Sequence, residues 1–102
     1  LYTYDSYLQP TTLYHLQPGK RPSVLKRLPS RFPSKNLEVQ QLQVPSKDGT
    51  LIPYFVIGPK GKEKEALPTL LYGYGGFEIA LSPAYSPVVG NLWLTKGGRY
   101  VV

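Results

Sequence analysis

A short apolar run that breaks into glycines and aromatic residues constrains the fold of this chain most. The run extends from Thr69 to Tyr72, and Gly73, Gly75 and Gly76 follow it. A continuous apolar run bounded by turn residues is typical of a buried strand. Glycines remove the side chains where the backbone must turn sharply or approach a ligand closely. The pattern therefore predicts a buried strand over residues 69–72 that leads directly into a glycine loop.

Upstream of this run, the sequence predicts a β-hairpin. An Asp-Gly pair at residues 48–49 is a strong turn signal, and it lies between β-prone runs at residues 37–44 and 51–57. The alternation of apolar residues changes phase at the Gln-Gln pair at 40–41, which predicts a β-bulge there. Pro53 cannot donate a hydrogen bond to a neighbouring strand, so it indicates a sheet edge or a bulge.

Downstream of the glycines, the sequence predicts a short helix. Ser86 is a favourable N-cap, and Pro87 suits the first helical turn. Apolar residues then recur at helical spacing, at Val88, Val89, Leu92 and Trp93. The glycines at 97–98 are expected to stop the helix, and another buried strand is expected from Tyr100.

The N-terminal part of the chain predicts three short strands. Tyr2 and Tyr4 alternate with polar residues in the first, and the others are expected at residues 11–16 and 23–28. Small antiparallel meanders of this kind form the blades of propellers. The prolines and polar residues at 29–33 predict a stiff, exposed junction with the rest of the chain.

The composition limits the classes of protein to which this chain can belong. Hydrophobic residues make up 41% of the 102 residues, which is normal for a globular protein. The absence of cysteine excludes a disulfide framework and a thiolate metal site. No cluster of His, Asp or Glu has metal-ligand spacing, so no metal or cofactor is expected. No apolar run approaches the roughly 20 residues that span a bilayer, so no membrane partner is expected.

The charge raises a question about nucleic acid. The net charge is +6, and the basic residues gather loosely between Lys20 and Lys35 in a chain with nine tyrosines. Basic patches with aromatic side chains are typical of nucleic-acid-binding proteins. Charge alone, however, indicates solubility rather than specific function. A solvated surface beside an interdomain junction is therefore the preferred interpretation, and no nucleic-acid partner is expected.

Several segments together resemble the prolyl oligopeptidase family of serine peptidases. Tyr-Gly-Tyr-Gly-Gly-Phe at residues 72–77 carries the resemblance, which continues through residues 78–87 and 97–102. Ser-Lys-Asp-Gly-Thr-Leu-Ile-Pro at residues 46–53 supports it upstream. The resemblance implies an α/β fold class, the start of an α/β-hydrolase domain preceded by the last strands of a β-propeller. It implies that residues 1–29 end the propeller and that residues 30–102 form the incomplete N-terminal part of the peptidase domain.

The resemblance also implies roles for residues of the glycine loop. In the family, the tyrosine that matches Tyr74 donates its hydroxyl proton to the oxyanion of the substrate, where many esterases carry a histidine. A phenol with a pKa of about 10 stays protonated at neutral pH and so remains a donor. Phe77 matches a phenylalanine of the substrate-binding pocket, whose ring can stack on a substrate proline. Gly75 and Gly76 belong to the same substrate-binding loop and allow its backbone geometry, whereas Tyr72 is expected to be a core residue.

No catalytic triad is expected within these residues. The sequence contains no Gly-x-Ser-x-Gly nucleophile elbow, and the family places its catalytic Ser, Asp and His later, beyond residue 102. His15 has no acid placed to orient it, so it is rejected as a catalytic base. Ser82 and Ser86 flank prolines without an elbow and are rejected as nucleophiles.

The function implied by the resemblance is that of a serine-type oligopeptidase or endopeptidase that cleaves short peptides after proline. The chain would supply part of the oxyanion hole and of the specificity pocket, and it is expected to be inactive alone. Relatives of oligopeptidase B, which prefers basic residues, and of acylaminoacyl peptidases remain alternatives. A small basic β-rich nucleic-acid-binding module is the alternative from another class. The parent protein is expected to be monomeric and cytoplasmic, with a periplasmic or secreted location as the alternative.

Overall fold

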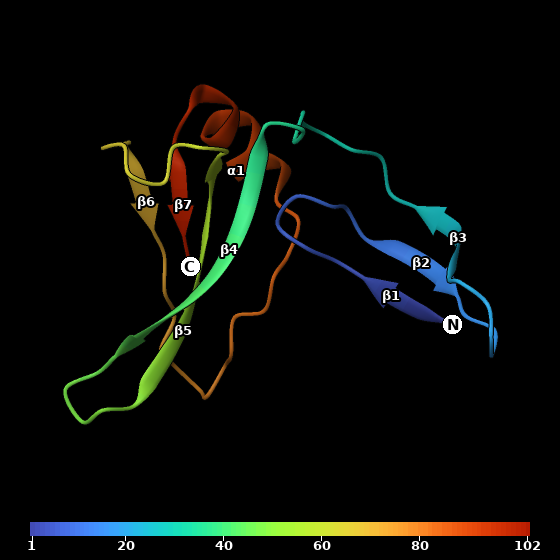
Figure 1. Ribbon diagram of the computed structural model, residues 1–102, viewed down its shortest axis with the longest axis horizontal. Helices are drawn as coiled ribbons and strands as arrows, with labels where there is room; N and C mark the ends of the chain where they lie inside the picture. Colours follow the sequence, from blue (N-terminus) through green and yellow to red (C-terminus); the bar gives the residue numbers. More distant parts are fainter.

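The structure consists of two β-sheets (Figure 1). Residues 28–36, here called the crossing segment, join them. The computed structural model describes residues 1–102 throughout. The first sheet is antiparallel, and its strands in order are β1 (Tyr2–Tyr4), β2 (Thr12–His15) and β3 (Ser23–Arg27). The second sheet has the strand order β4-β5-β7-β6, with β4 (Leu37–Pro45), β5 (Leu51–Pro59), β6 (Thr69–Leu71) and β7 (Arg99–Val101). Helix α1 (Pro87–Leu92) and a 3₁₀ turn, η1 (Leu94–Lys96), lie between β6 and β7.

The three strands of the first sheet confirm the N-terminal prediction. Their β-branched and aromatic residues suit a pleated sheet, and Tyr2 stacks on Tyr14 across β1 and β2, with ring centroids 5.2 Å apart. An irregularity that the sequence did not predict lies between β2 and β3. Leu13 pairs with Lys26 and Tyr14 pairs with Val24, so the residue between these two partners is the extra residue of a bulge.

The β4–β5 hairpin confirms the Asp-Gly turn but not the predicted bulge. Gly49 has a φ of +85° at the turn, where a residue without Cβ is favoured. The pairing then runs without a register shift from Pro45 opposite Leu51 to Leu37 opposite Pro59, so the bulge predicted at residues 40–41 is wrong. The change of phase reflects a long strand whose apolar residues change from one face to the other.

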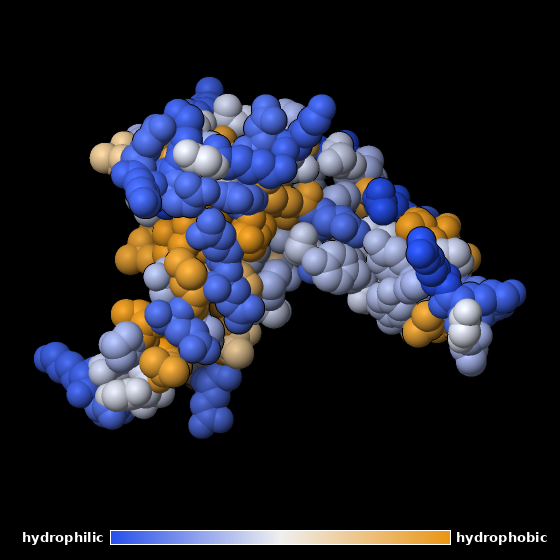
Figure 2. Space-filling view, viewed as in Figure 1, coloured by the Kyte–Doolittle hydropathy of each residue, from blue (hydrophilic) through white to orange (hydrophobic).

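The position of Pro53 confirms the predicted edge. Pro53 lies in the part of β5 that pairs with β4 alone, because β7 reaches only as far as Val56 and Ile57 in the register. Apolar side chains are exposed along this extension of the hairpin, and Figure 2 shows them as an orange stretch between hydrophilic ends.

Strand β6 forms as predicted, but it is not buried. It pairs in parallel with β7 on one side and forms the edge of the sheet on the other. Leu71 is 75% exposed and Leu70 is also exposed, so the expectation of a buried strand over residues 69–72 is wrong for this chain. An apolar run of this kind is buried only when other elements cover both faces of the sheet, and no element of this chain covers β6.

Helix α1 begins as the sequence predicts, but it ends at Leu92, and only the 3₁₀ turn η1 continues to the glycines at 97–98. The Ser86 side chain accepts a hydrogen bond from the Val89 N–H at 3.3 Å, and Pro87 occupies the first turn. Gly97, with a φ of +84°, ends η1. Gly98 makes room for Trp93, since a Cβ at Gly98 would lie 2.6 Å from the indole nitrogen.

Only some of the apolar residues predicted for this helix pack against the core. Val89 and Trp93 pack against the core, whereas Val88 and Leu92 are 66% and 65% exposed. The strand expected from Tyr100 forms as β7, which is half-buried in the interior of the sheet.

A single small core joins the two sheets. Its buried residues come from the β1–β2 connection, the crossing segment, the second sheet and η1, and they are Tyr7, Phe32, Leu37, Ile57 and Leu94. The Tyr7 ring contacts Phe55 and Tyr100, with centroids 5.3 and 6.4 Å apart. Because Tyr7 precedes β2 and its partners lie in the second sheet, this contact ties the two halves together.

The whole chain is open for its size. It exposes 7632 Å², whereas a folded monomer of this mass exposes about 5,800 Å². Its radius of gyration is 15.8 Å, against about 13 Å for a domain of this length. Figure 1 shows why, since the two sheets diverge from their shared core. None of the helices has the length and apolar character required to cross a membrane.

Candidate functional site

The candidate site is the loop of residues 72–86, which connects β6 to α1 and is here called the site loop. Tyr72 still belongs to the sheet edge, because its N–H donates to the Val101 carbonyl at 2.8 Å. The chain then leaves the sheet at the carboxyl end of β6. In sheets with parallel strands, the loops at this end are the usual place for ligand sites.

Tyr74 and Gly76 lie against each other in the site loop. A Cβ at Gly76 would lie 3.1 Å from the Tyr74 hydroxyl oxygen and 3.3 Å from the ring carbon that carries it. The absence of a side chain at Gly76 therefore leaves the space that the phenol occupies. The Tyr74 side chain is 45% exposed, so its hydroxyl group can reach a ligand.

The sharp turn of the site loop falls on residues that are not glycine. Phe77 and Glu78 have φ values of +56° and +54°, and the Ile79 N–H donates to the Gly76 carbonyl at 3.2 Å. Two consecutive central residues with positive φ define a turn of type I′. None of Gly73, Gly75 and Gly76 has a positive φ, so of the two roles predicted for these glycines the sharp turn is not the one they fill, and the close approach to a ligand stays a prediction.

This turn stores strain and presents an aromatic ring. The left-handed conformation costs a residue with a side chain roughly 1–2 kcal/mol, and such strain is concentrated at functional sites. Phe77 is 90% exposed, so its ring is available to a ligand. The sequence carries no signal for the turn, because Asn and Gly, rather than Phe and Glu, are the usual residues of a type I′ turn.

The other residues weighed from the sequence lie apart from this pair. His15 is half-buried in β2 of the first sheet, and Ser86 is engaged as the N-cap of α1. Tyr72 is 47% exposed, so the prediction that it is a core residue is wrong. No group of His, Asp and Glu side chains has an arrangement that could hold a metal ion.

Sequence reasoning missed Tyr85, at the far end of the site loop. The Tyr85 ring stacks on Phe32 with centroids 5.0 Å apart and planes 6° apart. Its hydroxyl oxygen accepts a hydrogen bond from the Arg31 N–H at 2.7 Å, and its own N–H donates to Asp5 Oδ1 at 3.3 Å. These partners are 54 and 80 residues away in sequence, so no local pattern could have revealed them.

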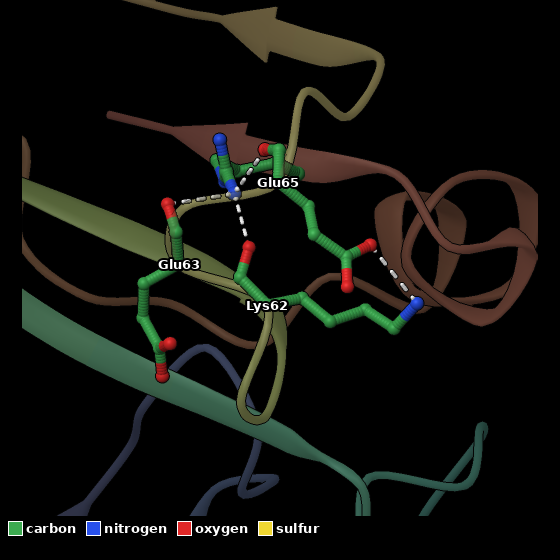
Figure 3. Close-up of polar contacts among 4 residues, drawn as sticks. Lys62, Glu63 and Glu65 are labelled. Atoms are coloured by element: carbon green, nitrogen blue, oxygen red, sulfur yellow. Dashed lines mark hydrogen bonds and ion pairs between the residues drawn. The ribbon is translucent and has the colours of Figure 1, made fainter.

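A separate cleft of about 360 Å³ lies on the second sheet, lined by Glu38, Glu63 and Arg99 among others. At one side of this cleft, Arg99 Nη2 donates to the carbonyls of Lys62, Glu63 and Glu65 at 2.8, 3.3 and 3.2 Å, and Figure 3 shows these bonds to the three labelled residues. A hydrogen bond shared with the Glu63 carboxylate raises the pKa of Glu38. The Glu63 carboxylate accepts a hydrogen bond from its own backbone N–H, and this bond, followed by the one with Glu38, lowers the pKa of Glu63. The three hydrogen bonds from Arg99 hold the loop that follows β5.

Comparison with known proteins shows the family of this chain. An uncharacterised peptidase of Sinorhizobium fredii is 40% identical over 100 residues, which cover 96% of this chain and 14% of the relative. The prolyl endopeptidase of Elizabethkingia miricola is 37% identical over 103 residues, covering 99% of this chain and 14% of the relative. The chain belongs to the prolyl oligopeptidase family. It spans about one seventh of the length of these relatives, since 14% of each is covered, and no family model matches it.

Solved structures of the prolyl oligopeptidase family share the fold of the whole chain. One prolyl endopeptidase superposes with a TM-score of 0.83 at 29% identity, over 98% of this chain and 15% of that protein. A post-proline cleaving enzyme of Rickettsia typhi gives a TM-score of 0.79 at 30% identity, over 97% and 14% respectively. Oligopeptidase B of Leishmania major also gives 0.79, but its identity of 23% shows the fold alone.

Proposed function

We propose that this chain is part of a serine endopeptidase that cleaves short peptides after proline, and that it supplies a donor of the oxyanion hole. The observation that carries the proposal is the placement of the Tyr74 hydroxyl. It lies over Gly76 in a loop at the carboxyl end of β6, and Tyr74 as a residue is 45% exposed. Relatives that match almost the whole chain are prolyl endopeptidases.

In this proposal, Tyr74 acts on the acyl-transfer step. A serine elsewhere in the protein attacks the scissile carbonyl while a histidine takes its proton. The carbonyl oxygen then gains negative charge, and the Tyr74 O–H donates a hydrogen bond to it. None of the 102 residues forms a nucleophile elbow, so the triad belongs to other residues of the full-length protein.

In the proposed function, Phe77 contributes to the specificity for proline. The strained turn at residues 77–78 holds the ring away from the protein surface, with 90% of its area exposed. A flat aromatic face can cover the apolar ring of proline, and an apolar contact in a specificity pocket contributes about 1–3 kcal/mol to discrimination. We infer that this ring forms one wall of the pocket for the residue before the scissile bond.

The same proposal assigns the two sheets to two domains. Residues 1–29 would be the last strands of a β-propeller, and residues 30–102 would begin the α/β-hydrolase domain. The unit of β6, α1 and β7, in which two parallel strands are linked through a helix, is the repeating unit of α/β sheets. This unit and the separate antiparallel sheet of residues 2–27 support the assignment.

The test compares chromogenic substrates on the full-length protein. We expect kcat/KM for a Gly-Pro amide to exceed that for an Arg-Arg amide by at least about 10-fold, because a fitted pocket discriminates by this much or more. Phe77→Ala should lower kcat/KM for the proline substrate by at least about 10-fold, and Phe77→Tyr, which keeps the ring, should lower it less. A preference for the Arg-Arg amide would refute proline specificity and favour the oligopeptidase B alternative.

A further inference from the structure

We propose that Tyr85 is a positioning residue, which ties the site loop to the first sheet through Asp5 and to the crossing segment through Arg31. The position of the first sheet would then control where Tyr74 and Phe77 lie. The proposed effect on catalysis rests on the proposed function, whereas the mechanical coupling does not.

The first step of the argument is that the middle of the site loop is weakly held. The backbone groups of residues 73–84 make one backbone hydrogen bond, from the Ile79 N–H to the Gly76 carbonyl, and that bond is internal to the loop. Tyr74, Phe77 and Ile79 are all exposed. The path of this segment therefore depends on how its two ends are fixed.

The second step is that the two ends are fixed to different sheets. At one end, the Tyr72 N–H bonds to Val101 of β7 in the second sheet. At the other end, the Tyr85 N–H bonds to Asp5, which directly follows β1 of the first sheet. Figure 1 shows the loop, in orange, running down from β6 and then turning back up to α1. A shift of one sheet relative to the other must therefore change the distance that the loop spans.

The third step is that Tyr85 rests on a rigid partner. Phe32 is only 5% exposed, and a Cβ at Gly90 of α1 would lie within 2.0 Å of its ring. Asn91 of α1 also donates to the Arg31 carbonyl at 3.0 Å. The stack of Tyr85 on Phe32 thus holds the end of the site loop against both the crossing segment and α1, and Asp5 adds the first sheet to this contact.

The chain offers a matched pair of variants at Asp5. Asp5→Asn keeps an oxygen that can accept from the Tyr85 N–H, whereas Asp5→Ala removes the acceptor. A buried or half-buried acceptor of this kind contributes about 1–2 kcal/mol, which corresponds to a factor of about 5 to 30. Tyr85→Phe keeps the stack on Phe32 and removes only the acceptor for the Arg31 N–H. Glu65→Gln, in an exposed ion pair with Lys62, serves as a distant control.

Limited proteolysis by chymotrypsin and steady-state kinetics of the full-length protein test the inference. We expect Asp5→Ala to speed cleavage after Tyr74 and Phe77 by about 5- to 30-fold and to lower kcat by a similar factor with little change in KM. Asp5→Asn should restore both, and Tyr85→Phe should give an intermediate effect. Glu65→Gln should change neither, and melting temperatures should show that all the variants fold.

Two results would overturn the inference. One is an unchanged rate of cleavage after Tyr74 and Phe77 in a folded Asp5→Ala or Tyr85→Phe protein. The other is an equal loss of kcat in Asp5→Ala and Asp5→Asn, which would mean that the charge and not the acceptor matters. A wild-type protein without post-proline activity would instead refute the proposed function, and the proteolysis data would still decide whether Tyr85 couples the site loop to the first sheet.

Discussion

The most direct test of the site is the replacement Tyr74→Phe in the full-length protein, which removes one hydroxyl group and keeps the ring. Because Tyr74 is 45% exposed, the change should alter the free energy of unfolding by less than about 0.5 kcal/mol. The ring should keep its place over Gly76, since the space there is already free of a side chain. The effect of the substitution should therefore be confined to the transition state.

The expected magnitude follows from the usual contribution of one oxyanion donor. Such a donor contributes about 2.7–4 kcal/mol, so kcat should fall by about 100- to 1,000-fold for a substrate whose chemistry limits turnover. If domain motion or product release limits turnover, the loss should be smaller for good substrates and larger for poor ones. The assay is therefore steady-state hydrolysis of a good and a poor proline amide.

Tyr72→Phe is the matched control. Tyr72 is exposed to a similar extent, at 47%, and lies two residues earlier in the same segment, but its N–H is bound to β7 and it has no assigned role in catalysis. We expect a change in kcat of less than about 3-fold for this variant, the scale of a substitution at an uninvolved surface site. If the two variants slow turnover equally with both substrates, Tyr74 is a structural residue and the assignment of the site is wrong.

Three further predictions concern the chain itself. The isolated 102-residue chain should not hydrolyse a proline-containing chromogenic dipeptide, and turnover that is lost on mutation of His15 or Ser82 would contradict this. The isolated chain should also unfold broadly and associate, because β6 is an unpaired edge. A sharp monomeric melt with salt-sensitive oligonucleotide binding would favour the nucleic-acid alternative instead. In the full-length protein, Tyr7→Phe should raise the free energy of unfolding by about 1–3 kcal/mol, because the Tyr7 hydroxyl is buried without a partner, and an unchanged or lowered melting temperature would refute this.

The pH dependence of Tyr7 provides a second measurement of the same burial. Burial, and then the nearby Tyr100, raise the pKa of Tyr7 above its ordinary value of 10.0. The unfolded chain therefore loses this proton at lower pH than the folded chain, and the free energy of unfolding falls as the pH rises above about 10. Alkaline unfolding of the Tyr7→Phe protein should show a shallower decline with pH than that of the wild type.

Elements whose signals are local can be predicted without a structure. The Asp-Gly pair specifies the β4–β5 turn because its residues tolerate positive φ. Ser86 specifies the start of α1 because its oxygen can accept from an N–H three residues ahead. The resemblance of residues 72–77 to a family pointed to the site loop in the same way, since a run of glycines and tyrosines is visible without a structure.

Which of these elements are covered, and where the site loop turns, depends on contacts between residues far apart in sequence. The apolar run of β6 predicts burial, but burial depends on what packs against a strand, and β6 lies at an open edge. The turn at Phe77 and Glu78 opposes the intrinsic preference of both residues, so it depends on the path imposed on the loop. That path is set in part by the contacts of Tyr85 with Asp5 and Arg31, which join residues far apart in sequence, and such contacts leave no local pattern to read.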